Sequence, residues 1–92
     1  MAILLSDSEI QSKLGQLPTW TLDGKTIKTL RQFKNFVEAI RFVNCLVEPA
    51  EAAGHHPDIY VSYNKVTIQL TTHDAGGLTD LDFKMAEVIS QL

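Results

Sequence analysis

The 92-residue chain contains a single cysteine, no long apolar run and no excess of basic side chains. One cysteine rules out an internal disulfide and a zinc site built from several cysteines. No segment reaches the 18 or more consecutive apolar residues that indicate a membrane-spanning helix. The net charge of −3 gives no reason to expect direct binding to nucleic acid. We therefore expect a globular protein without a membrane or nucleic-acid partner.

The composition is typical of one small domain. Hydrophobic residues make up 45% of the chain and charged residues 21%, close to the averages of globular proteins. A chain of this length can bury one modest core, so we expect residues 1–92 to form a single domain. The apolar start of the chain lacks a basic flank and is too short for a signal peptide. A soluble, cytoplasmic protein is the expectation.

Alternating apolar and polar residues over positions 58–71 predict a β-hairpin with one apolar and one polar face. We place its turn at Asn64-Lys65, because asparagine tolerates the left-handed conformation that a two-residue loop requires. This turn pairs Val61 with Ile68 across the two strands. Helices would cover the apolar face and leave the polar face open.

The same register brings the histidines of the chain together. It places His56 opposite His73 at the open end of the hairpin, with His55 adjacent. Directly opposed residues in antiparallel strands have Cβ atoms about 4.5–5.5 Å apart. We therefore expect all three histidines to meet at one end of the sheet, on its polar face. A shift of the register by one residue would separate them.

Capping pairs mark the starts of three helices, and an Asp-Gly turn marks a second hairpin. The predicted order is αββαββα. It predicts an α+β fold in which a four-stranded antiparallel sheet carries helices packed on one face. The capping pairs are Ser6 with Glu9, Asn35 with Glu38 and Thr79 with Asp82, and the turn is Asp23-Gly24.

The two longer helices differ in how much apolar surface they carry. The second, over positions 36–53, is apolar on more than one stripe, which favours either a subunit interface or deep burial in a small domain. Pro49 predicts a kink or a division, Gly54 predicts the end, and Cys45 is expected to be buried. The third helix is expected to bury one face made of Leu81, Met85, Val88, Ile89 and Leu92.

Three chemical interpretations fit the histidine cluster. The imidazoles could be hydrogen-bonded structural groups. They could ligate a metal with a carboxylate from Asp74 or Glu51, although the His-x₃-His spacing is absent. They could also act without a metal, because imidazole has a pKa of about 6.5 and can donate or accept a proton at neutral pH. Trp20 and Tyr60 could stack on a flat ligand or belong to the core.

Four short segments narrow these alternatives. They are Glu51-x₃-His55-His56-Pro57, Tyr63-Asn64-Lys65-Val66, Thr72-His73-Asp74 and Gly77-Leu78-Thr79. Together they resemble the pterin-4a-carbinolamine dehydratases. The resemblance runs from about position 20 to the end of the chain, and the αββαββα order agrees with the fold of that family.

The resemblance implies a hydro-lyase that dehydrates a 4a-hydroxytetrahydropterin to a quinonoid dihydropterin and so recycles a tetrahydrobiopterin-type cofactor. It implies that no metal and no cofactor is required, because a ring nitrogen lone pair expels the hydroxyl. By the resemblance, His55 and His73 are the catalytic acid–base pair and His56 holds the pterin ring. The further substrate contacts that it implies are Glu51, Thr71, Thr72, Asp74 and Trp20.

The resemblance also implies partners. Positions 36–53 resemble the helix through which members of the family assemble, so we expect a homo-oligomer, either a dimer or a tetramer. Some animal members have a second role as a dimerisation cofactor of a homeodomain-type transcription factor. The alternative function is therefore a non-catalytic binding, assembly or transcription-coactivator module of the same fold, acting through a protein partner.

Overall fold

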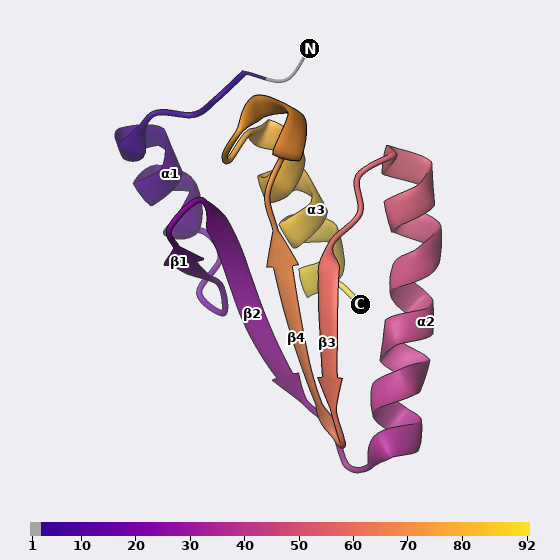
Figure 1. Cartoon of the computed structure of the whole chain (residues 1–92). Coiled ribbons are helices and arrows are strands. Elements are labelled where there is room, and N and C mark those ends of the chain that lie inside the picture. Colours follow the sequence, from indigo (N-terminus) through magenta and orange to yellow (C-terminus); the bar gives the residue numbers. More distant parts are fainter. Residues whose placement is uncertain (1–2) are drawn as a thin grey trace.

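The structure is a computed structural model that describes residues 3–92, and it confirms the α+β fold expected from the sequence. Met1 and Ala2, at the short apolar start of the chain, lie outside the described residues. The order αββαββα is as predicted, with one additional 3₁₀ turn. The elements are α1 (Asp7–Leu14), β1 (Thr21–Asp23), β2 (Thr26–Gln32), α2 (Phe36–Ala53), β3 (Asp58–Ser62), β4 (Lys65–Leu70), η1 (His73–Ala75) and α3 (Asp80–Ser90) (Figure 1).

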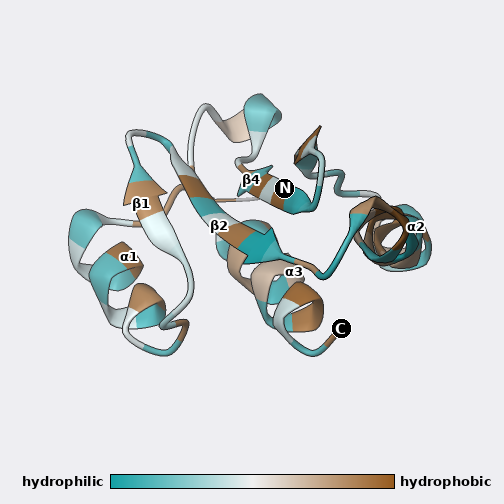
Figure 2. Cartoon of the chain, turned by 90° about the horizontal axis from the view of Figure 1, so that it is seen from below, coloured by the Kyte–Doolittle hydropathy of each residue, from teal (hydrophilic) through white to brown (hydrophobic). Residues whose placement is uncertain are grey.

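The four strands form one antiparallel sheet in the order β1-β2-β4-β3, so that β1 and β3 are its edges. The three helices lie on one side of the sheet, with α2 at the β3 end (Figure 2). Along β4, Val66, Ile68 and Leu70 are buried, and the residues between them stay partly exposed. Because side chains alternate along a strand, one face of the sheet packs on helices and the other faces solvent.

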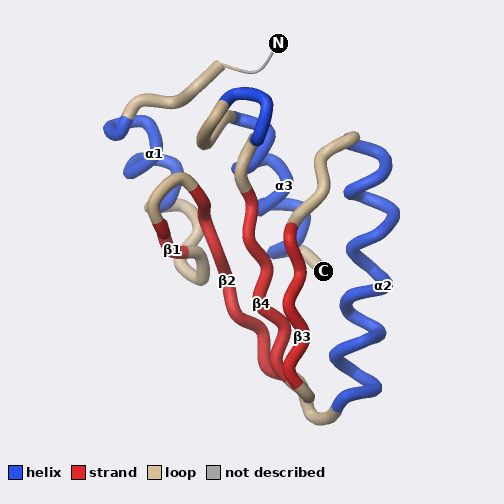
Figure 3. The backbone as a smooth tube through the Cα atoms, in the orientation of Figure 1, coloured by secondary structure: helices blue, strands red, loops and turns tan. Residues whose placement is uncertain are grey.

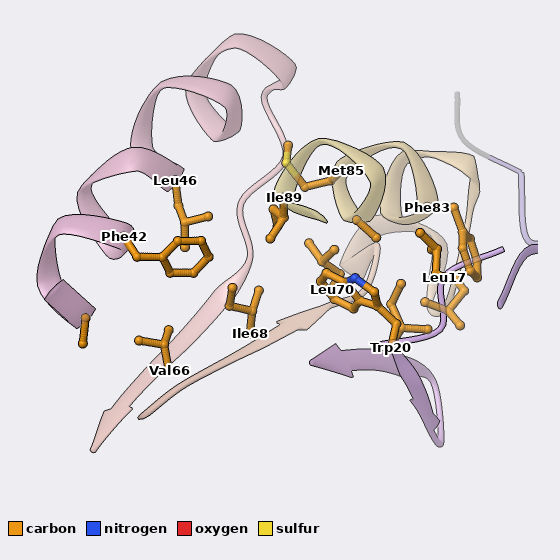
Figure 4. Close-up of a cluster of buried hydrophobic side chains, with 14 residues drawn as sticks. Leu17, Trp20, Phe42, Leu46, Val66, Ile68, Leu70, Phe83, Met85 and Ile89 are labelled. Carbon is orange, nitrogen blue, oxygen red and sulfur yellow. The ribbon is translucent and has the colours of Figure 1, made fainter. Parts of the chain in front are cut away.

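A cluster of buried apolar side chains fills the space between the sheet and the helices (Figure 4). β4 lies in the middle of the sheet and supplies three of them. The helices cover these β4 side chains on the inner face of the sheet. The helix α2 contributes Phe42 and Leu46, and α3 contributes Met85 and Ile89. The core therefore holds α2, β4 and α3 in fixed positions relative to one another.

The register of the β3–β4 hairpin differs from the prediction. Val61 pairs with Val66 instead of Ile68, so the turn is Tyr63-Asn64. Tyr63 takes the positive φ, 51°, that the sequence analysis assigned to asparagine. Because the pairing moves by two residues, an even number, each side chain keeps its predicted face.

The shifted turn has a physical reason in the contacts of Asn64. Its side-chain amide donates a hydrogen bond to the carbonyl of Phe33 at 2.8 Å. The N–H of Phe33 donates in return to the carbonyl of Asn64 at 2.7 Å. These two bonds fix Asn64 against the segment after β2, a long-range contact that turn propensities do not include.

The longest helix, α2, runs unbroken through Pro49, so of the predicted kink or division the division is wrong. A proline removes the hydrogen bond to the carbonyl four residues earlier, here that of Cys45. Cys45 is exposed, so that water can solvate this carbonyl. The prediction that Cys45 is buried is therefore also wrong.

Within residues 3–92, none of the helices combines the length and the apolar character needed to cross a bilayer.

The buried face of α3 is rotated from the predicted one. Met85 and Ile89 are buried as expected, but Leu81 and Val88 are 39% and 43% exposed. Asp82 is instead fully buried. A hydropathy pattern places a carboxylate outside, whereas hydrogen-bond donors inside the protein hold this one in the buried row.

Gly54 ends α2 in the left-handed conformation, with a φ of 62°. We predict that Gly54→Ala lowers the free energy of unfolding by about 1 kcal/mol, because a side chain is strained at positive φ. A steric clash contributes nothing, since an added Cβ meets no atom within 4 Å. Gly54→Asn should lose less, because asparagine tolerates this conformation. Urea unfolding followed by circular dichroism measures both variants, and equal stability of all three proteins would contradict this reasoning.

Candidate active site

The end of α2, the start of β3 and the segment after β4 meet at one end of the sheet (Figure 3). A hollow of about 270 Å³ lies among them. All three histidines of the chain contribute to its wall. The lining residues are Gly54, His55, His56, Thr71, Thr72, His73, Asp74 and Leu81.

The histidines meet for a different reason from the one predicted. His56 precedes β3 and His73 begins η1, so neither belongs to the paired part of the hairpin. Continuing the observed register would bring His56 opposite Thr71. His73 joins the cluster because the chain turns back through η1, where Gly76 has a φ of 77° and Thr72 pairs with Gly77.

His55 is held by a buried carboxylate. Its side chain is 11% exposed, and its Nε2 lies 2.6 Å from Oδ1 of Asp82, which is fully buried in the first turn of α3. His55 therefore points toward the helix side of the sheet, and its expected position on the polar face is wrong. A carboxylate behind an imidazole fixes both the orientation of the ring and the nitrogen that carries the proton.

Two further donors converge on Asp82. Its Oδ2 accepts hydrogen bonds from the hydroxyl of Thr72 at 2.8 Å and from the N–H of Thr79 at 2.9 Å. An ionised carboxylate only accepts, so Nε2 of His55 is the protonated nitrogen that donates to Oδ1. Nδ1 of His55 is then the ring nitrogen that remains for a molecule in the hollow.

The hydroxyl groups around Asp82 have only one consistent orientation. Thr72 uses its single hydroxyl hydrogen on Asp82, so the hydroxyl of Thr79 donates to Thr72 Oγ1 at 2.8 Å. Thr79 Oγ1 accepts in turn from the N–H of Leu81 at 3.2 Å. Among residues 3–92, every buried side-chain nitrogen or oxygen has a hydrogen-bond partner. The hydroxyl of Thr72 thus supports Asp82 and has no hydrogen left to donate to a ligand.

The other two histidines are more exposed. His56 pairs with Glu51, with Nε2 and Oε2 2.5 Å apart and the two side chains 59% and 70% exposed. The side chains of His73 and Asp74 are exposed and form no hydrogen bond within the described part of the chain. Thr71 also lines the hollow, and its hydroxyl donates to the carbonyl of Lys25 at 2.7 Å. A ligand in the hollow would therefore contact the imidazole of His55, held by a buried carboxylate, and the more exposed imidazoles of His56 and His73.

Trp20 lies away from the hollow. It is 4% exposed within the apolar cluster, and its indole N–H donates to Ser90 Oγ at 3.0 Å (Figure 4). Ser90 is the last residue of α3, whereas the hollow lies at the first turn of that helix. Trp20 is thus a core residue, and the prediction that it contacts a substrate in this hollow is wrong, because the hydrogen bond to Ser90 holds it at the far end of α3.

The capping pattern predicts Asp82 only at the start of a helix, and the contact of Asp82 with His55 is not evident from it. A signal was present, because Asp82 lies three, four and seven residues before Met85, Ala86 and Ile89, which are all buried. A charged residue in the apolar row of a helix indicates a buried partner.

Among residues 3–92, no three His, Cys, Asp or Glu side chains are arranged to hold a metal ion.

Comparison with known sequences identifies close relatives. Residues 3–92 match the family described as "Pterin 4 alpha carbinolamine dehydratase". A protein of Cyanothece sp. is 70% identical over all of this chain and 95% of its own length, and one of Nostoc sp. is 65% identical over all of this chain and 99% of its own. Both carry the name "Putative pterin-4-alpha-carbinolamine dehydratase".

Solved structures share the fold. The crystal structure of a transcriptional coactivator/pterin dehydratase from Brucella melitensis superimposes with a TM-score of 0.89 and 36% identity, over 95% of each chain. A pterin dehydratase-like protein that is a RuBisCO assembly factor in the alpha-carboxysome gives a TM-score of 0.67 and 21% identity, over 79% of this chain and 87% of the other. The second likeness shows the fold alone.

Two aspartates in the first turn of α3 allow a matched test of the buried carboxylate. We predict that Asp82→Ala lowers the free energy of unfolding by about 3 kcal/mol, because it leaves buried donors of Thr72, Thr79 and His55 unpaired. Asp80→Ala removes only a surface ion pair with Lys13 and should cost about 0.5 kcal/mol. Chemical denaturation measures both, and equal losses would show that the Asp82 contacts contribute little.

Proposed function

Because the chain belongs to the pterin-4-alpha-carbinolamine dehydratase family, we propose that it removes water from a 4a-hydroxytetrahydropterin in the hollow at the end of the sheet. The observation that carries this proposal is the convergence of three imidazoles on that hollow, one of them fixed by a buried carboxylate. The product would be the quinonoid dihydropterin, a step that recycles a tetrahydropterin cofactor for further use.

The reaction needs two proton transfers. The hydroxyl on C4a must gain a proton to leave as water, and N5 must lose one as its lone pair forms the new C4a=N5 double bond. The electrons come from the substrate itself, so the chemistry balances without a metal or a redox cofactor. A positioned acid or base contributes about 10²–10⁴-fold to the rate of each transfer.

His55 is suited to accept the proton from N5. Its Nε2–H donates to Asp82, so in the neutral ring Nδ1 carries the lone pair that remains for a substrate in the hollow, which His55 lines. When Nδ1 takes up a proton the ring becomes positively charged, and the adjacent carboxylate stabilises that charge. Asp82 thus orients the base and does not itself exchange a proton with the substrate.

His73 is suited to donate the proton to the leaving hydroxyl. It lines the same hollow from η1, and its exposure lets the ring recover a proton from water after each turnover. The remaining polar groups fit the edge of a pterin, which carries N–H donors and carbonyl and ring-nitrogen acceptors. Asp74 can accept from the donors, and His56, with Glu51 behind it, can hold the opposite edge.

We predict that His73→Ala and His55→Gln each lower kcat by about 10²-fold or more. The His55 variant is glutamine because its side-chain amide can still donate to Asp82, so the buried carboxylate stays paired. The assay follows the absorbance of a freshly generated 4a-hydroxytetrahydropterin against its spontaneous dehydration, with a metal chelator present. Gln69→Ala, on the open face of the sheet, is the control and should keep wild-type turnover. Wild-type rates in both histidine variants would overturn the assignment of roles, and no acceleration by the wild-type chain would overturn the function.

We also propose that the protein self-associates through α2 and the β3 edge. Next to its core-facing row, α2 carries a second apolar row with the 4-3-4 spacing of a helix seam, namely Phe36, Ile40, Val43 and Val47. Between α2 and β3 lies an apolar groove of about 170 Å³. β3 is an edge strand with one charged residue, Asp58, and no proline, so it lacks the usual protection against pairing.

A second copy of the chain fits this edge. Two β3 strands paired antiparallel about Tyr60 would place Asp58 opposite Ser62, which keeps the like charges apart. Such pairing would also bring the two α2 rows toward each other. A dimer formed in this way continues the sheet across both subunits and covers the apolar groove.

We predict that Val47→Asp converts the assembly to monomers, because it puts a carboxylate into the apolar row of α2. Val47 is 58% exposed, and Leu30, 59% exposed on the open face of the sheet, is the matched site. Leu30→Asp should leave the assembly intact. Light scattering after size-exclusion chromatography measures the mass. A monomeric wild-type chain would contradict self-association and leave this surface to a different protein, as the non-catalytic alternative requires.

A further inference from the structure

Among residues 3–92, the side chains that line the hollow are polar except at one position. Histidine rings, hydroxyl groups and a carboxylate supply most of it, and Gly54 has no side chain. Of the residues that the structure describes, Leu81 is the one large aliphatic side chain in the lining. It is 39% exposed, although it lies on a helix whose other face packs in the core. An isolated exposed leucine is ordinary on a protein surface, so its position, and not its exposure, is the informative feature.

Leu81 is held rigidly at that position. Its N–H donates to Thr79 Oγ1, and the next residue, Asp82, is fixed in the buried network. The first turn of α3 is therefore anchored on both sides of Leu81. A side chain on an anchored backbone can contact a ligand with little loss of conformational entropy.

We propose that Leu81 packs against the face of the pterin ring and sets the affinity for the substrate. This inference rests on the proposed function. A 4a-hydroxytetrahydropterin is a puckered bicyclic ring whose edges carry the nitrogen and carbonyl groups. One of its faces carries the 4a-hydroxyl, and the opposite face is largely apolar. The imidazoles, Thr71 and Asp74 can satisfy the edges, and Leu81 is the lining side chain that can remove ring-face surface from water.

The role predicts a separation between binding and catalysis. A contact with the ring face is made equally in the ground state and in the transition state, so its loss should raise KM and leave kcat almost unchanged. Truncating the leucine to alanine removes three carbon atoms from that contact. We expect Leu81→Ala to raise KM about fivefold to tenfold, with kcat within about twofold of wild type.

Two further variants make the test specific. Leu81→Met keeps the apolar volume and should bind the substrate within about twofold of wild type. Val88→Ala is the matched control, because Val88 lies on the same helix with a similar exposure, 43%, but away from the hollow. It should leave both constants unchanged. An unchanged KM in Leu81→Ala, or an equal rise in Val88→Ala, would overturn the proposal.

A binding measurement separates this inference from the proposed function. Titration calorimetry with 7,8-dihydrobiopterin, which lacks the 4a-hydroxyl and cannot be dehydrated, reports ring binding alone. If the wild-type chain binds this probe without catalysing dehydration, the function fails, and a fivefold to tenfold weaker Kd in Leu81→Ala still supports the contact. Equal Kd values in the two proteins, or no binding by wild type, would overturn it.

Discussion

A carboxylate removed from water must be surrounded by donors, and this requirement at Asp82 joins the fold of the protein to its site. The donors come from three segments, namely His55 after α2, Thr72 after β4 and Thr79 at the start of α3, and His55 is 27 positions away from Asp82. Those same three segments form the wall of the hollow. The interaction that satisfies a buried charge therefore also sets the shape of the site and the direction of the His55 ring.

Local signals were sufficient to predict the order of the elements and the starts of the helices. Ser6 with Glu9 and Thr79 with Asp82 form capping boxes as expected, because a capping box depends on residues three apart. The register of the central hairpin depends on a contact between Asn64 and Phe33, 31 positions apart, which no local pattern contains. The error was an even shift, so the predicted faces of the strands survived it.

In the candidate site, too, local sequence patterns predict some features, while others depend on contacts between distant residues. The meeting of the three histidines could be anticipated from the sequence, although the turn at η1 and not the strand register brings His73 to the cluster. The direction of the His55 side chain could not be anticipated, because it depends on the carboxylate of Asp82, 27 positions away, which a hydropathy pattern places on the surface. Trp20 was misplaced for a related reason, since its hydrogen bond to Ser90 spans 70 positions.

The hydroxyl of Thr79 donates to Thr72, and that of Thr72 donates to Asp82. In the proposed mechanism, this relay lets Thr79, which does not line the hollow, influence the orientation of His55. Each hydroxyl has one hydrogen, so the relay has a single direction, and a residue that cannot both donate and accept would break it. In the proposed mechanism, a substitution that removes the hydroxyl of Thr79 would therefore weaken the cap of α3 and the orientation of His55 at the same time.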